Sequence, residues 1–124
     1  MVDSYLWGKV DRISPEAPVP VLEVGEEFFR FGGAANVALN IAALGGIPIP
    51  IGVIGDDNFG IIFSTLLNDS KIPSDGILID DSRPTTTKTR VIADSQHVVR
   101  IDKESKEYLN SKMEGKIFDY IKKI

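Results

Sequence analysis

The chain has 124 residues, of which 43% are hydrophobic and 26% charged, and it contains no cysteine. This length suits one domain or part of one, and no stretch reaches the roughly 18 apolar residues of a membrane span. A net charge of −4 argues against a nucleic-acid-binding surface, and the lack of cysteine excludes disulfides and thiolate zinc sites. With no sign of a signal peptide at its start, we expect a cytoplasmic protein that binds neither nucleic acid nor membrane.

The first part of the chain contains a proline-rich segment, residues 13–24, with prolines at positions 15, 18 and 20. Because proline disrupts helices and central strands, we expect an extended edge segment that continues into a strand at about 19–24. Residues 1–3 open the chain without a strand leading into them. We therefore expect the first strand of the domain to be absent.

The middle of the chain alternates between helical and strand patterns. Apolar residues at helical spacing predict a helix over 34–44, preceded by a glycine pair and ended by another. The elements predicted after it are a strand at 49–54, a helix at 58–69 with Asp57 as its N-cap, and a strand at 77–79. This alternation is typical of an α/β fold with parallel strands.

From Thr85 the sequence becomes β-branched and alternating, and a polar break at 93–96 separates it from a second apolar run at 97–101. This pattern predicts a hairpin, whose period of two places Thr86, Lys88 and Arg90 on one face. Together with the proline-rich segment, the hairpin would form a small sheet that projects from the α/β body as a lid.

The end of the chain predicts a helix. Ser111 and Glu114 match a capping box, and an apolar stripe follows at Met113, Ile117, Tyr120, Ile121 and Ile124. The stripe is still running at the last residue, so we expect that both ends of the chain are cut from a longer domain.

Gly32 and Gly33 are the strongest indication of a ligand site. Glycine lets the backbone approach a ligand closely, and the N-terminus of the following helix offers free N–H groups. Asn36, in the first helical turn, both donates to and accepts from hydroxyl groups, which suits a polyhydroxylated ligand. The segment has neither a Walker A lysine nor the G-x-G-x-x-G dinucleotide pattern. On the residues alone, a tight turn with Asn36 bonding locally explains the pattern equally well.

The motif Gly-Gly-Ala-Ala-Asn-Val-Ala at 32–38, followed by Gly45 and Gly55, resembles the N-terminal signature of the ribokinase-like (PfkB) carbohydrate kinases. Within that family, segments 3–8, 12–21 and 83–90 are most similar to the kinase portion of the bifunctional heptose-7-phosphate kinase/ADP-heptose synthase enzymes. The resemblance covers the chain to about Glu104. It implies a partial three-layer α/β fold that lacks its first strand and its C-terminal nucleotide-binding half. The lid segments would be about 8–31 and 85–101, and the body about 32–80 and 105–124.

The resemblance also implies a substrate pocket. Asp3 would accept hydrogen bonds from sugar hydroxyls, and Gly32, Gly33 and Asn36 would form the rest of the sugar-binding cradle. Tyr5 and Trp7, which follow Asp3, either pack against the sugar or fill the core of the lid, and we favour the core.

Two cations of the lid hairpin complete the substrate-binding residues. Lys88 and Arg90 would bind the phosphate of the substrate, Arg90 by its planar fork and Lys88 as a point charge. The alternative is that both are solvated charges on a strand.

The sequence lacks the Gly-x-Gly-Asp motif that supplies the general base in this family, so we expect no catalytic, cofactor-binding or metal-binding residue here. ATP and magnesium would serve only the complete enzyme. We therefore expect the sugar-binding N-terminal portion of an ATP-dependent D-glycero-D-manno-heptose 7-phosphate 1-kinase of ADP-heptose and lipopolysaccharide precursor synthesis, a homodimer through its lid and inactive by itself. The alternatives are a non-catalytic module that dimerises or binds sugar, and a ribokinase-like fragment specific for another sugar.

Overall fold

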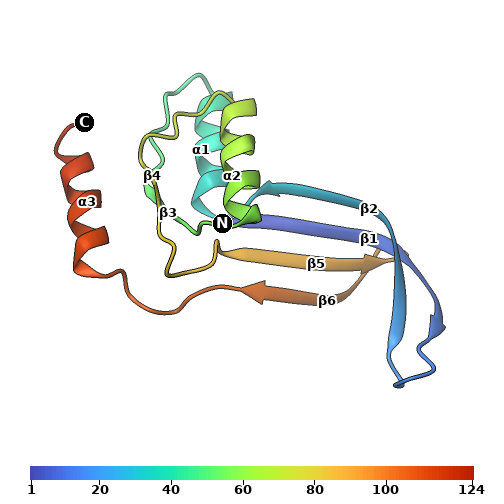
Figure 1. The fold of residues 1–124 in the computed structure, drawn as a ribbon. Coiled ribbons are helices and arrows are strands. Elements are labelled where there is room, and N and C mark those ends of the chain that lie inside the picture. The colour runs from blue at the N-terminus through green and yellow to red at the C-terminus, as the bar shows by residue number, and fades with distance from the viewer.

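The structure is a computed structural model that describes all residues, 1–124. Figure 1 shows a long four-stranded sheet, here called the lid sheet, attached to a smaller α/β body. None of the helices is long and apolar enough to cross a lipid bilayer. The elements are β1 (Val2–Ile13), β2 (Pro20–Phe31), α1 (Ala34–Ala43), β3 (Gly52–Ile54), α2 (Asn58–Asp69), β4 (Ile77–Ile79), β5 (Thr87–Ala93), β6 (Gln96–Lys103) and α3 (Ser111–Ile121).

The lid sheet has the strand order β2-β1-β5-β6. β1 pairs antiparallel with β2 and parallel with β5, and β5 pairs antiparallel with β6. The turn between β5 and β6 places Asp94 and Ser95 at φ 48° and 65°, as a type I′ hairpin turn requires. The hairpin predicted from the sequence is therefore confirmed.

β1 was not predicted as a strand from the sequence pattern, and β2 is longer than predicted. β1 begins at Val2, and β2 extends from Pro20 to Phe31 rather than ending near residue 24. Two glutamates in the middle of β2 break the apolar pattern, but pairing with β1 supplies the backbone hydrogen bonds whatever the side chains are. The predicted edge position of this segment is confirmed, because β2 is the outer strand and tolerates Pro20 at its start.

The α/β body contains the parallel pair β3 and β4, with α1 and α2 on one side and α3 on the other (Figure 1). The helices predicted at 34–44 and 58–69 and the strand at 77–79 are confirmed, while β3 is shorter than its predicted range. The fold class is mixed α/β, as expected.

The cap of α3 differs from the prediction. Asn110, not Ser111, is the N-cap, since its Oδ1 accepts the Met113 N–H at 2.9 Å. The capping box at Ser111 was therefore wrong by one residue, because asparagine is an equally good N-cap and precedes the serine. Only Met113 of the predicted stripe is buried, and Ile121 and Ile124 are exposed.

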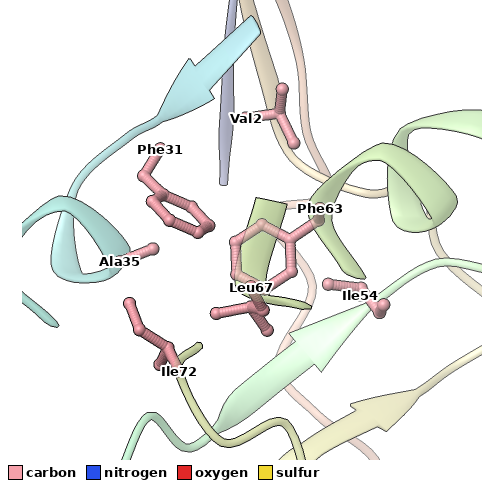
Figure 2. Packing of buried hydrophobic residues seen from close by; sticks show 7 residues of the cluster. All are labelled: Val2, Phe31, Ala35, Ile54, Phe63, Leu67 and Ile72. Atoms are coloured by element: carbon pink, nitrogen blue, oxygen red, sulfur yellow. The ribbon is translucent and has the colours of Figure 1, made fainter. Parts of the chain in front are cut away.

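The hydrophobic core lies where the base of the lid sheet meets the helices. Phe31 of β2 packs edge-on against Phe63 of α2, with ring centroids 5.6 Å apart, and Phe29 contacts Phe59 in the same way at 6.2 Å. Figure 2 shows the seven buried residues of this cluster, which are Val2, Phe31, Ala35, Ile54, Phe63, Leu67 and Ile72. The lid sheet is thus anchored to the body by apolar contacts at its base.

A polar junction ties the turn after β3 to the start of β5. Asp57 Oδ1 accepts the N–H of Gly60 and Oδ2 accepts the N–H of Thr85, both at 2.9 Å. The Thr85 hydroxyl oxygen in turn accepts the N–H of Gly55 at 2.9 Å. Burial alone would raise the pKa of Asp57, but these hydrogen bonds outweigh it and lower the pKa below the ordinary 3.8.

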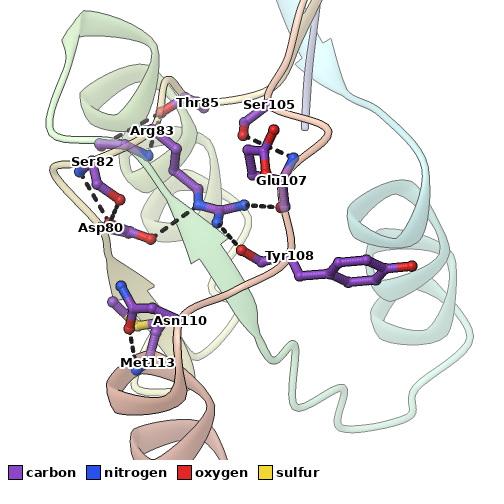
Figure 3. A network of polar contacts seen from close by, with 10 residues as sticks. Asp80, Ser82, Arg83, Thr85, Ser105, Glu107, Tyr108, Asn110 and Met113 are labelled. Carbon is purple, nitrogen blue, oxygen red and sulfur yellow. Dashed lines mark hydrogen bonds and ion pairs between the residues drawn. The ribbon is translucent and has the colours of Figure 1, made fainter.

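A second cluster continues the junction toward α3 (Figure 3). The buried Asp80 carboxylate accepts the Ser82 hydroxyl at 2.6 Å and the Arg83 Nε at 2.9 Å. The Arg83 guanidinium also donates to the carbonyl oxygens of Glu107 and Tyr108 at 3.3 and 3.1 Å. The 80–85 turn therefore holds both the junction and the linker that leads into α3.

A first prediction concerns Gly60, in the first turn of α2. A Cβ at Gly60 would collide with the Gly55 carbonyl oxygen, whereas one at Gly115 of α3 would meet nothing within 4 Å. Gly60→Ala should therefore lower the free energy of unfolding by about 1–3 kcal/mol. The matched control Gly115→Ala should raise it by about 0.5–1 kcal/mol. Urea unfolding followed by circular dichroism measures both, and equal effects of the two changes would refute the close packing at Gly60.

A second prediction concerns Asp57 and pH. Its pKa is lower in the folded chain than the ordinary 3.8, so its stabilising contribution is full above 3.8 and is lost as the pH falls through the folded pKa. Asp57→Asn should be less stable than the wild type at neutral pH, because an amide NH₂ cannot accept the Thr85 N–H. The difference between the two should shrink toward pH of about 3. Unfolding curves across this range test the linkage, and a pH-independent difference would contradict it.

Candidate functional site

Two rows of side chains cross one face of the lid sheet next to the body. Residues that are directly opposite on neighbouring strands, and residues two apart on one strand, share a face. The row nearer the body is Arg30, Asp3, Lys88 and Asp102, and the next is Phe28, Tyr5, Arg90 and Arg100. The two rows hold four cations and two carboxylates and so carry a net charge of +2, in a chain whose net charge is −4.

Three of the four cations are paired with carboxylates. Lys88 Nζ lies 2.9 Å from Asp102 Oδ2, and Arg100 binds the same carboxylate through Nε and Nη2 at 2.9 and 3.0 Å. Hydrogen bonds from Lys88 and then Arg100 hold the pKa of Asp102 below its ordinary value. Arg90 Nη1 lies 3.1 Å from Asp3 Oδ1.

The contact between Arg90 and Asp3 is electrostatic but poorly oriented. Both Arg90 Nη1 and Asp3 Oδ1 are buried, and neither has a partner in hydrogen-bond geometry. Buried polar atoms of this kind are rare, because an unsatisfied donor or acceptor destabilises the folded state. The pair is therefore held by charge rather than by an oriented hydrogen bond.

The aromatic part of the second row supports the remaining cation. Tyr5 and Phe28 are stacked, with ring centroids 4.8 Å apart and planes within 6°. The Arg30 guanidinium lies 5.2 Å from the Phe28 ring and 5.8 Å from the Tyr5 ring, and Arg90 lies 5.4 Å from the Tyr5 ring. Arg30 makes none of the ion pairs in the structure.

A cavity of about 550 Å³ opens beside these rows, between the lid sheet and the first two helices. Its polar lining combines a carboxylate, an amide, a guanidinium and a phenol hydroxyl, which together match a ligand with several hydroxyl groups. The lining residues are Asp3, Tyr5, Phe29, Arg30, Phe31, Asn36, Leu39, Leu66 and Ser70.

The glycine pair lies next to two residues of the cavity, Asp3 and Asn36, although neither glycine lines it. A Cβ on Gly32 would lie 2.8 Å from Asp3 Oδ1 and 2.5 Å from Met1 Cε, so glycine lets the chain pass directly against the Asp3 carboxylate. Gly33 has φ 54° and is the N-cap of α1, which has no side-chain cap. The first turn of α1, including Asn36, therefore begins beside Asp3.

The structure brings four of the six residues expected in the site close together. Asp3 and Asn36 line the cavity, Gly32 packs on Asp3, and Arg90 pairs with Asp3. Of the other two, Lys88 lies opposite Asp3 on β5 but its Nζ is bonded to Asp102, and Gly33 is the N-cap of α1.

The structure adds residues that the sequence did not indicate. Arg30 and Phe28 join the site only because β2 pairs with β1, so that Arg30 lies opposite Asp3 and Phe28 opposite Tyr5. In the sequence alone, the only indication was that Phe28 and Arg30 are two residues apart, the spacing that places two side chains on the same face of a strand. The interpretation of Trp7 as lid core was wrong, since 39% of this residue is exposed on a sheet that has no second layer to cover it.

The chain matches a known protein family along almost its entire length. The family model described as pfkB family carbohydrate kinase matches residues 2–124. The bifunctional protein HldE of Helicobacter pylori strain J99 is 50% identical over 121 residues, which are 98% of this chain and 26% of HldE. The chain thus spans about a quarter of the length of the HldE proteins that it matches.

Solved sugar kinases have the same fold. The fructokinase of Halothermothrix orenii superposes with a TM-score of 0.61 at 28% identity, covering 89% of this chain and 37% of the fructokinase. A putative sugar kinase from Clostridium perfringens superposes with a TM-score of 0.69 over 98% of this chain and 37% of its own, at 17% identity, a similarity of fold alone. The expected ribokinase-like fold is therefore confirmed, and the chain belongs to the pfkB family of carbohydrate kinases.

Proposed function

We propose that the chain is the N-terminal, acceptor-sugar-binding portion of an ATP-dependent kinase acting on D-glycero-D-manno-heptose 7-phosphate, in the synthesis of ADP-heptose for lipopolysaccharide. The observation that carries this proposal is one cavity that holds the Asp3 carboxylate and the Asn36 amide beside a face with net positive charge. Family membership supports the sugar kinase class. The choice of a heptose rests on the resemblance of segments 12–21 and 83–90.

Each proposed residue has a separate role toward the sugar. The Asp3 carboxylate accepts hydroxyl donors, and the Asn36 amide both donates and accepts. Gly32 lets the chain pass close to the Asp3 carboxylate, and Gly33 adopts the positive φ with which α1 begins. Lys88 and Arg90 add positive charge toward the phosphate, and Arg90 also holds the Asp3 carboxylate from the neighbouring strand.

The phosphoryl donor is assigned outside this chain. Residues 1–124 form no group of three or more His, Cys, Asp or Glu side chains that could hold a metal ion. We derive no phosphoryl-transfer step from them. In this proposal ATP and magnesium are bound by the remainder of the enzyme, and the chain alone has no kinase activity.

The binding role predicts a difference between two asparagines of α1. Asn36→Ala should weaken binding of D-glycero-D-manno-heptose 7-phosphate about tenfold, because a hydrogen-bonding amide is lost from the cavity. The matched control Asn40→Ala, one helical turn further and outside the cavity lining, should bind like the wild type. Calorimetric titration measures both. No binding by the wild type would overturn the proposed function, and binding of ATP would contradict the assignment of the donor site elsewhere.

A second candidate function is self-association through the lid. β6 is an outer strand whose eight residues are all exposed, with Val98, Val99 and Ile101 exposed by 44%, 49% and 54%. An uncovered apolar strand edge pairs readily with another strand. A second copy of the chain is the proposed partner.

Sedimentation velocity over a concentration series tests this second candidate. The wild type should dimerise, and Val99→Lys should remain monomeric, because a lysine on an edge strand disfavours strand pairing. The control Val24→Lys places the same charge on β2, the opposite edge, and should still dimerise. Dimerisation of Val99→Lys, or loss of dimerisation only in Val24→Lys, would refute the β6 interface.

A further inference from the structure

The sequence did not assign Arg30 or Arg100 of the two rows to the site, and of these two only Arg30 has no carboxylate partner. We propose that Arg30 binds the phosphate of the acceptor sugar and so determines whether this site prefers a phosphorylated or an unphosphorylated sugar. This inference rests on the proposed function, since it presumes that a sugar occupies the cavity beside Asp3 and Asn36.

The neighbouring cations are already paired with carboxylates. Lys88 and Arg100 share the Asp102 carboxylate, and Arg90 contacts Asp3 at 3.1 Å. An incoming phosphate must compete with these carboxylates for each of the three. Arg30 has no carboxylate partner, although Asp3 lies opposite it on the neighbouring strand. Its full charge is therefore available to an anion.

Arg30 is also well placed to reach a ligand in the cavity. Arg30 lines the same cavity as Asp3 and Asn36, whereas Lys88 and Arg90 do not. A sugar whose hydroxyls are held by the carboxylate and the amide would meet Arg30 before any other cation. The three groups come from β1, β2 and α1, so their arrangement is held by the strand pairing and by the turn at Gly32.

Two aromatic rings support the Arg30 side chain. The Arg30 guanidinium lies over the stacked rings of Phe28 and Tyr5, at 5.2 and 5.8 Å from their centroids. Stacking orders the guanidinium before the ligand arrives, which reduces the entropy lost on binding. The planar fork keeps N–H groups at its edge, which match two phosphate oxygens.

Arg30 distinguishes the two kinds of sugar because only a phosphorylated sugar presents an anion to it. A phosphomonoester carries a charge of about −1.5 to −2 at neutral pH and accepts strong hydrogen bonds. An unphosphorylated sugar leaves Arg30 exposed to water, where the charge is already solvated. Arg30 therefore adds affinity for the phosphorylated sugar alone, whereas Asn36 serves both.

Calorimetric titration with D-glycero-D-manno-heptose 7-phosphate and with D-glycero-D-manno-heptose tests the inference. Arg30→Gln should weaken binding of the phosphorylated sugar about 10-fold to 100-fold and leave binding of the unphosphorylated sugar unchanged. Arg30→Lys keeps the charge but loses the planar fork, and it should also bind the phosphorylated sugar more weakly than the wild type. The control Lys9→Gln removes one exposed charge further along β1 and should leave both affinities unchanged.

The possible outcomes distinguish a failure of the proposed function from a failure of the role proposed for Arg30. A wild type that binds neither sugar overturns the proposed function. A wild type that prefers the phosphorylated sugar, together with unchanged binding by both Arg30 variants, leaves the proposed function intact and overturns the role of Arg30. An equal loss for both sugars in Arg30→Gln also overturns it, because that result indicates a change of cavity shape. Thermal melting by circular dichroism identifies any unfolded variant, and Arg30→Lys then carries the test.

Discussion

The carboxylate of Asp57 is the interaction on which the arrangement of the lid depends. It accepts the N–H of Gly60 at the start of α2 and the N–H of Thr85 just before β5, so one side chain joins the body to the lid sheet. Glycine is required at position 55 because the 83–85 segment passes too close for a Cβ, and at position 60 because a Cβ there would collide with the Gly55 carbonyl oxygen. With Thr85 held, β5 runs parallel beside β1, and Lys88 and Arg90 are carried alongside Asp3 and Tyr5. The candidate site is therefore a consequence of a junction that does not itself line it.

The charge pattern of the lid sheet follows from strand register rather than from clustered basic residues in the chain. Arg90 and Arg100 lie opposite each other, an arrangement that repulsion disfavours. Each turns to a carboxylate of the adjacent row, Arg90 to Asp3 and Arg100 to Asp102. The rows leave a positive face on an acidic protein, and the aromatic pair of Tyr5 and Phe28 holds the one cation without a carboxylate. Such a face is suited to an anionic ligand, which agrees with a sugar phosphate as the proposed substrate.

Local patterns were sufficient for the elements whose stabilising contacts are close in sequence. α2 was predicted with its correct ends because Asp57 caps it and its apolar residues recur at helical spacing. The β5–β6 hairpin was predicted because its turn residues are adjacent to the strands they join. The length of β2 was not predicted, because its hydrogen-bond partners are in β1. The cap of α3 was misplaced by one residue, because the neighbouring Asn110 and Ser111 are both good N-cap residues.

The sequence by itself determined the α/β class, the family signature from Gly32 to Asn36 and the choice of Asp3, Lys88 and Arg90 as candidates for the site. The tertiary structure decided which of these side chains meet. It placed Arg90 on Asp3 and Lys88 on Asp102, and it added Arg30 to the cavity. The physical reason is that periodicity and capping act within a few residues, whereas the neighbours of a strand side chain are set by partners tens of residues away in the chain.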